Sequence, residues 1–243
     1  MMTRFVICVS ICLCLSLTAS AAMISAVPNG ADRRVSADGS MKWPGSGDMR
    51  VGKGSTVGSA GVFVFELPVL PAGETVDSAD FAFSVIGGNN WRALHEKGMD
   101  LYAVRMSDAS NVLATDYYKG PYDGDASATA IEDYIVYETE ELNQGAPGEL
   151  GRHDTDADGE TALGDWLADQ YADASYDPAG TNYVFLRLSA RDDLTSDYRY
   201  WSVASADNGT EADRPALMIT TIPEPATLGL LALGGLALLR RRR

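Results

Sequence analysis

The amino-acid sequence predicts an all-β protein, an antiparallel β-sandwich over residues 23–221 with one or two short helices. Three observations predict this class. Short stretches of alternating apolar and polar residues recur through the range, and Gly, Pro, Asn and Asp separate them. No internal repeat or long linker divides the range, so one domain of about 200 residues is the simplest organisation.

Six segments have the composition and alternation of β-strands. In the segment 183–189, Val184, Leu186 and Leu188 share one face, which predicts a central strand with its apolar face on the core. The other predicted strands cover residues 61–67, 79–85, 100–106, 199–204 and 216–221.

Helical spacing is clear in one segment and weaker in another. An apolar stripe at intervals of three and four residues predicts a helix over 161–174, packed against an edge or end of the sheets. The same spacing of Ile131, Tyr134 and Ile135 predicts a second, shorter helix. The first stripe consists of Leu163, Trp166, Leu167, Gln170 and Tyr171.

The formal charge of −15 is unevenly distributed along the chain. Residues 1–22 and 226–243 hold five of the 19 basic residues and none of the 34 acidic ones, so the part between them has a formal charge of −20. Such a surface repels nucleic-acid phosphates and anionic lipid head groups, so we expect no nucleic-acid partner. It suits a soluble extracellular domain, or one that gathers divalent cations.

The N-terminus has the layout of a secretory signal peptide over residues 1–22. Arg4 supplies a positive charge, residues 5–17 form an apolar run, and Ala19-Ser20-Ala21 is a small-residue cleavage site for signal peptidase. A retained anchor is the alternative, but the run is shorter than the roughly 20 residues that span a bilayer. The three cysteines all lie in this run, so cleavage leaves none for a disulfide: Cys8, Cys12 and Cys14.

Three features follow one another in residues 222–243. The strip Pro223-Glu224-Pro225 comes first, an apolar run over 226–239 comes next, and four arginines over 240–243 close the chain. The prolines favour an extended strip that a processing enzyme can reach. The apolar run suits a short helix in the inner membrane with the arginines on the cytoplasmic side, as a temporary stop.

In motif, order, spacing and basic end, residues 223–243 resemble the PEP-CTERM sorting signal. The resemblance implies that an exosortase in the inner membrane of a Gram-negative bacterium removes the tail. The protein would then pass to the cell surface or the extracellular matrix, and its membrane contact would be transient, through the C-terminal helix alone. A plain tail anchor is the alternative.

Three stretches in the first half of the chain, residues 49–52, 62–73 and 76–81, form a second pattern. They are a Val-Gly turn, an apolar strand ending at Leu-Pro, and a Val-Asp-Ser-Ala strand. The pattern resembles the opening of DNRLRE-type, disaggregatase-related sandwiches. That resemblance implies a jelly-roll-like module similar to carbohydrate-binding domains, and it ends after about Met106.

Residues 154–165 form the strongest local motif, with aspartates at loop positions 1, 3 and 5 and a glycine at position 6. Calcium prefers several hard oxygen ligands on a sharply turning backbone, so the spacing predicts a calcium site. Asp at position 12 departs from the Glu of EF-hands but is used in dockerin-type loops. The alternative is an acidic loop in which Asp158 or Thr161 caps the helix. The predicted ligands are Asp154, Asp156, Asp158, the Glu160 carbonyl and Asp165.

Aromatic residues in Gly- and Asn-rich surroundings indicate what the surface binds, because exposed rings stack on sugar faces. We therefore expect an exported surface or matrix protein that holds polysaccharide. Packing of these rings in the core is the alternative. The aromatic residues are Trp43, Trp91, Tyr117, Tyr118 and Tyr122.

No catalytic residue set stands out, and we expect no enzymatic activity. His95 and His153 are the only histidines, too few for the usual zinc or nucleophile–base sets. Paired carboxylates arise by chance in a chain with 34 acidic residues. The alternative is a carbohydrate-active enzyme, a glycoside hydrolase or lyase, on the same scaffold.

Overall fold

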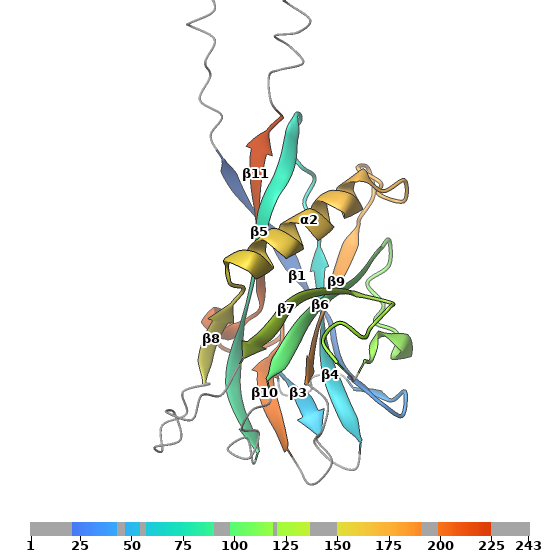
Figure 1. The fold of residues 1–243 in the computed structure, drawn as a ribbon, viewed down its shortest axis with the longest axis vertical. Coiled ribbons are helices and arrows are strands. Elements are labelled where there is room, and N and C mark those ends of the chain that lie inside the picture. The colour runs from blue at the N-terminus through green and yellow to red at the C-terminus, as the bar shows by residue number, and fades with distance from the viewer. Residues whose placement is uncertain are drawn as a thin grey trace, which may run out of the picture.

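Figure 1 shows the fold of the protein as a computed structural model, which describes residues 21–42, 47–53, 57–89, 98–118, 121–136, 150–190 and 199–224. Within these ranges the chain forms antiparallel strands, one α-helix and short 3₁₀ turns, which confirms the predicted all-β class. The helix is α2 (Ala157–Ala172). The strands are β1 (Ala22–Ser36), β2 (Met41–Lys42), β3 (Asp48–Lys53), β4 (Gly58–Glu66), β5 (Glu74–Asn89), β6 (Met99–Ser107), β7 (Thr129–Val136), β8 (Gly151–Asp154), β9 (Tyr183–Ala190), β10 (Arg199–Ala204) and β11 (Ala216–Pro223).

Six strands close into a barrel in the order β1, β11, β5, β10, β3 and β4, and β4 pairs back onto β1. The predicted sandwich is therefore wrong, and with it the jelly-roll arrangement. The reason lies in β1 and β5, which are 15 and 16 residues long. β1 pairs with β11 through Ala22–Ala26 and with β4 through Val27–Ser36, which carries the sheet around until its edges meet. All six ring strands lie between Ala22 and Pro223, so the barrel closes without either terminal segment.

A bulge in β1 completes this closure. The pairing of β1 with β4 shifts register between Asn29 and Arg33, and Asp32 lies buried inside the bulge. Its carboxylate accepts hydrogen bonds from Val64 N at 2.9 Å and Ala206 N at 2.8 Å. Burial raises the pKa of Asp32 to about 7 despite these two bonds, and the charge of Asp207 adds to the rise. The side chain thus joins three separate segments of the barrel.

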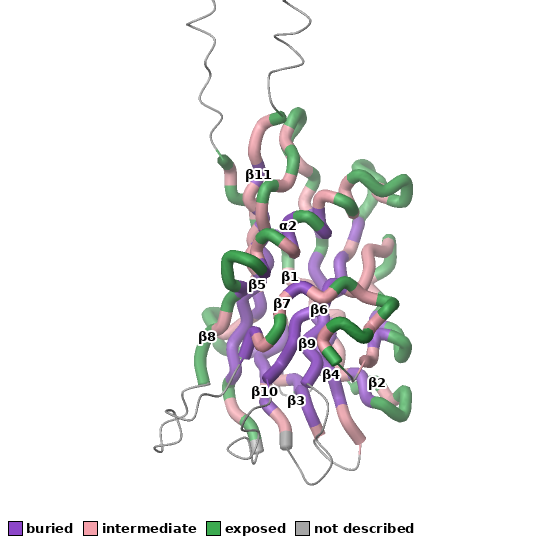
Figure 2. The backbone as a smooth tube through the Cα atoms, viewed as in Figure 1, coloured by how far each residue is buried: buried purple, intermediate pink, exposed green. Residues whose placement is uncertain are grey.

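The six predicted strands are confirmed as β4, β5, β6, β9, β10 and β11. β9 is buried on both faces rather than one. Leu186 and Leu188 belong to the main core, whereas Phe185 belongs to a second cluster with Val35, Val62, Val64 and Val112. Figure 2 shows the buried residues concentrated in the strands, including β6 and β9, which lie outside the ring of six. The chain therefore covers part of the outer wall of its own barrel.

Residues 129–136 form strand β7, so the predicted second helix is wrong. Ile131 and Ile135 are both buried, and a spacing of four residues places two side chains on one face of a strand as well as of a helix. Tyr134 has a φ of 58°, and its N–H donates to Asp100 at 3.0 Å. The pairing of β7 with β6 shifts register in the same stretch. The apolar spacing that predicted a helix therefore belongs to an irregular strand.

Helix α2 packs across β5 and β7, as Figure 1 shows. Its predicted apolar stripe is confirmed, because Leu163, Trp166 and Leu167 are buried in the main core. Gly164 lies against β5 so closely that a Cβ there would be 2.6 Å from the Cα of Ser78. The absence of a side chain sets the distance between helix and sheet.

Among the residues placed by the structure, no helix has the length and apolar character needed to cross a membrane. Residues 1–20 of the predicted signal peptide and the predicted apolar run 226–239 lie outside the described residues.

Candidate functional site

The two processing sites predicted from the sequence lie side by side. Ala22, at the predicted signal-peptidase site, pairs with Thr221 of β11, two residues before the sorting strip. Pro223 is the last residue of β11 and pairs with Glu74. The Glu224 N–H then donates to the carbonyl of Gly73 at 2.7 Å. The start of the sorting strip is thus extended, as its prolines predict, and joined to the barrel wall without a spacer; Pro225 lies outside the described residues.

The predicted calcium ligands lie around the start of α2. Asp154 ends β8, Asp156 is the N-cap of the helix, and the other three residues lie within the helix: Asp158, Glu160 and Asp165. Asp156 accepts a hydrogen bond from Gly159 N at 2.8 Å, so Asp156 caps the helix in place of the predicted Asp158 or Thr161. The helix begins inside the proposed loop. In the described part of the chain, no three His, Cys, Asp or Glu side chains are grouped to hold a metal, and calcium binding stays a prediction.

Glu132 of β7 joins this acidic cluster, and sequence reasoning missed it. Its carboxylate accepts a hydrogen bond from Asp156 N at 3.0 Å. Burial raises the pKa of Glu132 to about 7, and the negative charges of Asp156, Asp154 and Asp80 raise it further. Gly159 makes room for the carboxylate, since a Cβ there would lie 2.4 Å from Glu132 Oε2. Residue 132 is far from the motif in sequence, so no local spacing indicated it.

The predicted aromatic platform is only partly placed. Trp43 and Trp91 lie outside the described residues. Tyr117 packs against the second apolar cluster, while Tyr118 and Tyr122 contact the ring of buried Tyr102, with centroids 5.8 and 6.0 Å away. These contacts favour packing for the three tyrosines.

Arg187 of β9 holds this aromatic group together from a fully buried position. Its guanidinium donates to Asp125 at 2.6 Å, to the carbonyl of Asp116 at 3.1 Å and to Ser189 at 3.0 Å. It also lies 4.5 Å from the centroid of the Tyr102 ring. Because an aspartate and two further oxygens accept its hydrogen bonds, we assign Arg187 a structural role.

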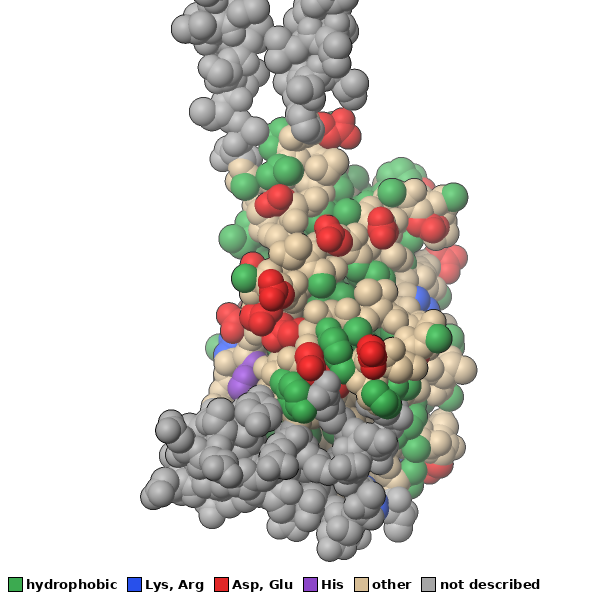
Figure 3. Space-filling model, in the orientation of Figure 1, with side chains coloured by type: hydrophobic (Ala, Val, Ile, Leu, Met, Phe, Trp, Pro, Cys, Tyr) green, Lys and Arg blue, Asp and Glu red, His purple; other side chains and the backbone are tan. Residues whose placement is uncertain are grey.

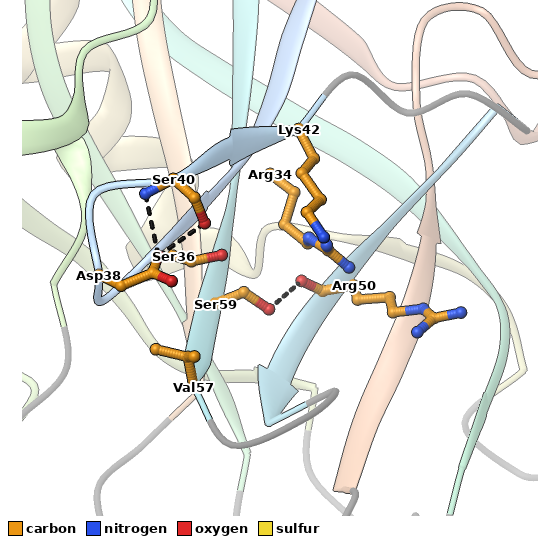
Figure 4. Close-up of a pocket in the computed structure, with 8 residues that line it drawn as sticks. All are labelled: Arg34, Ser36, Asp38, Ser40, Lys42, Arg50, Val57 and Ser59. Atoms are coloured by element: carbon orange, nitrogen blue, oxygen red, sulfur yellow. Dashed lines mark hydrogen bonds between the residues drawn. The ribbon is translucent and has the colours of Figure 1, made fainter.

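Two hollows flank the hairpin formed by β1 and β2. One is a groove of about 590 Å³ with polar side chains from β1 and the segment after β6, including Asn29, Ser110 and Asn111. The other is a smaller cavity of about 150 Å³, shown in Figure 4, which we call the cationic pocket. The side chains that define the cationic pocket are Arg34, Lys42, Arg50, Asp38, Ser36 and Ser59.

Four neighbouring strands supply the cationic pocket. Arg34 and Lys42 stand directly opposite each other on β1 and β2. Arg50 comes from β3, and its guanidinium lies 4.6 Å from the centroid of the Tyr200 ring. Ser59 of β4 donates to the carbonyl of Arg50 at 2.8 Å. Figure 4 shows the head groups of Arg34 and Lys42 on the same side of the cavity.

The charges of the cationic pocket are incompletely matched. Arg34 Nε is buried and has no hydrogen-bond partner among the described residues. Burial lowers the pKa of Arg34, and the positive charge of Arg50 lowers it further. Asp38 accepts hydrogen bonds from the Ser40 hydroxyl at 2.6 Å and from Ser40 N at 2.9 Å; these bonds, with the charge of Lys42, lower the pKa of Asp38.

Sequence reasoning missed the cationic pocket because the overall charge concealed it. Residues 33–53 hold five basic and two acidic side chains, a local excess of three positive charges in a chain of −15. A charge count by segment would have found this excess. The Asp38-Gly39 step between β1 and β2 is typical of a hairpin, and sequence reasoning did not use it to set two of the cations opposite each other.

The comparison with known proteins agrees with the C-terminal pattern. The PEP-CTERM protein-sorting motif matches residues 221–243. This motif marks an exported protein of a Gram-negative bacterium that an exosortase processes and that is sorted to the cell surface or the extracellular space. No curated protein matches the chain.

Proposed function

We propose that the barrel is a non-enzymatic component of the cell surface or extracellular matrix, which holds polysaccharide after signal peptidase and exosortase have removed its two ends. The observation that carries the proposal is the sorting motif at residues 221–243. The groove and the cationic pocket beside the β1–β2 hairpin support the polysaccharide part of it, because they offer amide, hydroxyl and cationic groups to a polar polymer.

The strand pairing at the processing sites supports removal of both ends. A cut after Ala21 leaves β1 complete from Ala22, and a cut at or after Glu224 leaves β11 complete to Pro223. Neither cut removes a paired residue of the ring. Mass spectrometry of the protein recovered from the cell surface should therefore find no peptide from residues 1–21 or 226–239. Peptides from the C-terminal run in the released protein would contradict the proposal.

Binding and turnover separate the proposal from the enzyme alternative. Protein spanning residues 22–224 should bind one or more members of a polysaccharide panel without releasing reducing ends or unsaturated products. Turnover that is lost when one or two carboxylates are changed would instead establish a carbohydrate-active enzyme. A chain that binds no member of a broad panel would contradict the polysaccharide part alone, and the sorting assignment would stand.

A further inference from the structure

We propose that the cationic pocket binds the carboxylate of an acidic sugar unit in a surface or matrix polysaccharide. The proposal rests on the proposed function, which it sharpens by naming a site and a class of sugar. The residues that would make the contact are Arg34 and Lys42, with the hydroxyls of Ser36 and Ser59 beside them, while the Arg50 guanidinium lies over Tyr200 and adds positive charge from the side (Figure 4).

The first argument is the balance of charge. Like charges placed directly opposite on neighbouring strands repel each other, and Arg34 and Lys42 are such a pair. Arg50 is near enough to add to the repulsion. Asp38 lines the cavity and Asp48 lies near Arg34, so two carboxylates face three cations. One further negative group would balance the cluster.

The second argument is hydrogen bonding. A buried guanidinium N–H without a partner is costly, and Arg34 Nε is in this position among the described residues. Asp38 is held in a turn by two hydrogen bonds from Ser40, which orients its carboxylate toward its own loop. Planar arginine groups match carboxylates in geometry, and their paired N–H donors bind the two oxygens together.

The third argument is size. A cavity of about 150 Å³ is on the order of the space that a six-membered ring occupies in a protein interior. One sugar ring that carries a carboxylate therefore fits, whereas a stretch of folded polypeptide does not. The pocket opens on the surface of the barrel, so the rest of a polymer can continue outside it.

The fourth argument is position, and it favours a polymer over a membrane lipid. Ala22 and Thr221 mark the end of the barrel from which the sorting tail departs. Arg34 lies 12 residues further along β1, which is up to about 40 Å away at the rise of an extended strand. While the tail is in the membrane, the cationic pocket is thus at the opposite end of β1. In Figure 3 the charged side chains on the face that carries α2 are mainly acidic, so that face does not attract a polyanion.

Calorimetric titration of residues 22–224 with tetragalacturonic acid tests the proposal, with the fully methyl-esterified tetramer as the uncharged probe. We expect binding of the acid, no measurable binding of the ester, and weaker binding of the acid at 200 mM than at 20 mM NaCl. Lys42→Gln should weaken binding by about tenfold or more, as expected for the loss of a charge-assisted hydrogen bond, and Arg50→Gln, which removes only a nearby charge, should weaken it less.

Lys53→Gln is the matched control, because Lys53 ends the strand that carries Arg50 but does not line the cavity. It removes the same charge and should change the affinity less than about twofold. Circular dichroism and thermal unfolding establish that each variant is folded. A loss as large for Lys53→Gln as for Lys42→Gln would overturn the pocket in favour of a diffuse effect of charge.

The remaining outcomes distinguish the pocket from the broader function. Equal binding of the acid and its ester, unchanged by Lys42→Gln, would overturn the pocket and leave polysaccharide binding in place. No binding of either sugar, together with binding of inorganic sulfate or phosphate that Lys42→Gln abolishes, would overturn the sugar carboxylate as ligand and leave a site for free anions only. It would also count against the polysaccharide function.

Discussion

Two regions of the molecule hold several charges of one sign close together, and they reduce the resulting repulsion in different ways. At the start of α2, Asp154, Asp156 and Glu132 lie together, yet backbone N–H groups donate to two of them. The helix N-terminus favours negative charge, and the raised pKa lets Glu132 take up a proton near neutral pH. The acidic cluster can therefore lower its own charge without a ligand.

The cationic pocket has less scope to lower its own charge. Arginine keeps its proton at any physiological pH, even where burial lowers its pKa. Arg187 shows how the same chain satisfies a buried guanidinium, with an aspartate, a carbonyl and a hydroxyl around it. The buried Nε of Arg34, by contrast, has no hydrogen-bond partner among the described residues. The comparison indicates that a ligand is more needed at the cationic pocket than at the acidic cluster.

The largest effect on stability is expected from Gly164→Ala, because this substitution changes how α2, whose start lies in the acidic cluster, packs against β5. Its Cβ would meet the Ser78 backbone, so α2 must shift away from β5. We expect a net loss of about 2 kcal/mol in the free energy of unfolding, although alanine favours a helix by about 1 kcal/mol. Urea unfolding measures it. Asp169→Ala, on the exposed side of α2, should stay within about 0.5 kcal/mol, and an equally small effect of Gly164→Ala would contradict the packing.

Glu132→Gln sharpens the comparison through pH. In the folded protein the pKa of Glu132 is about 7, above its ordinary value of 4.5. Between these two pH values the carboxyl of Glu132 is therefore ionised in the unfolded chain but still protonated in the folded one. Stability should fall as pH rises from 4.5 to 7 and then level off. Glutamine keeps an acceptor for Asp156 N and removes this penalty. We expect the variant to be more stable by about 1–2 kcal/mol at pH 8, after allowance for solvent screening, and about equal at pH 4.5. A gain of the same size at both pH values would refute the titration argument.

Calcium tests whether the acidic cluster also takes a ligand. If the predicted site at residues 154–165 binds calcium, stability should rise by about 1.4 kcal/mol at a concentration ten times Kd. Binding through an EF-hand-like loop would have to unwind the first turn of α2. Asp158→Asn should remove the rise and Asp169→Asn should not, as measured by thermal unfolding with calcium and with chelator. Equal melting temperatures in both solutions would leave Asp156 as a helix cap only.

The smallest effect is expected from Lys42→Gln in the absence of anions. Removing one of two opposed cations should raise stability by about 0.2–1 kcal/mol at low salt. Urea unfolding at 20 mM NaCl measures the gain, which should shrink at 200 mM NaCl because salt screens the repulsion. Loss of stability in Lys42→Gln would mean that the pair is already balanced within the protein.

The sequence predicted those parts of the fold that depend on local patterns. Alternation is a local property, and all six strands predicted from it are present. The stripe that includes Leu163 and Leu167 predicted the buried side of α2. The order of motifs at the C-terminus predicted the sorting signal, which the family comparison confirms. The resemblance of residues 49–81 to disaggregatase-related modules stays a prediction.

The parts that could not be predicted depend on pairing between distant segments. β1 contains Pro28, Gly30 and Asp32 and lacks alternation, and it is held as a strand by its partners β11 and β4. Barrel closure follows from that double pairing. The cationic pocket depends likewise on the pairing of β4 with β1 and with β3, and the cap at Asp156 receives its neighbour Glu132 from β7. Pattern alone indicates which way a side chain faces, not which strand lies beside it.

The pairing of Ala22 with Thr221 has a consequence in time. The first strand to leave the translocation channel must wait for the last one, 199 residues later, before the barrel can close. Contacts between such distant residues form slowly, because a long loop must close first. If the apolar run of the sorting tail enters the membrane as its sequence predicts, it would hold the nearly complete chain there while β11 pairs with β1. The barrel would then close before the tail is removed.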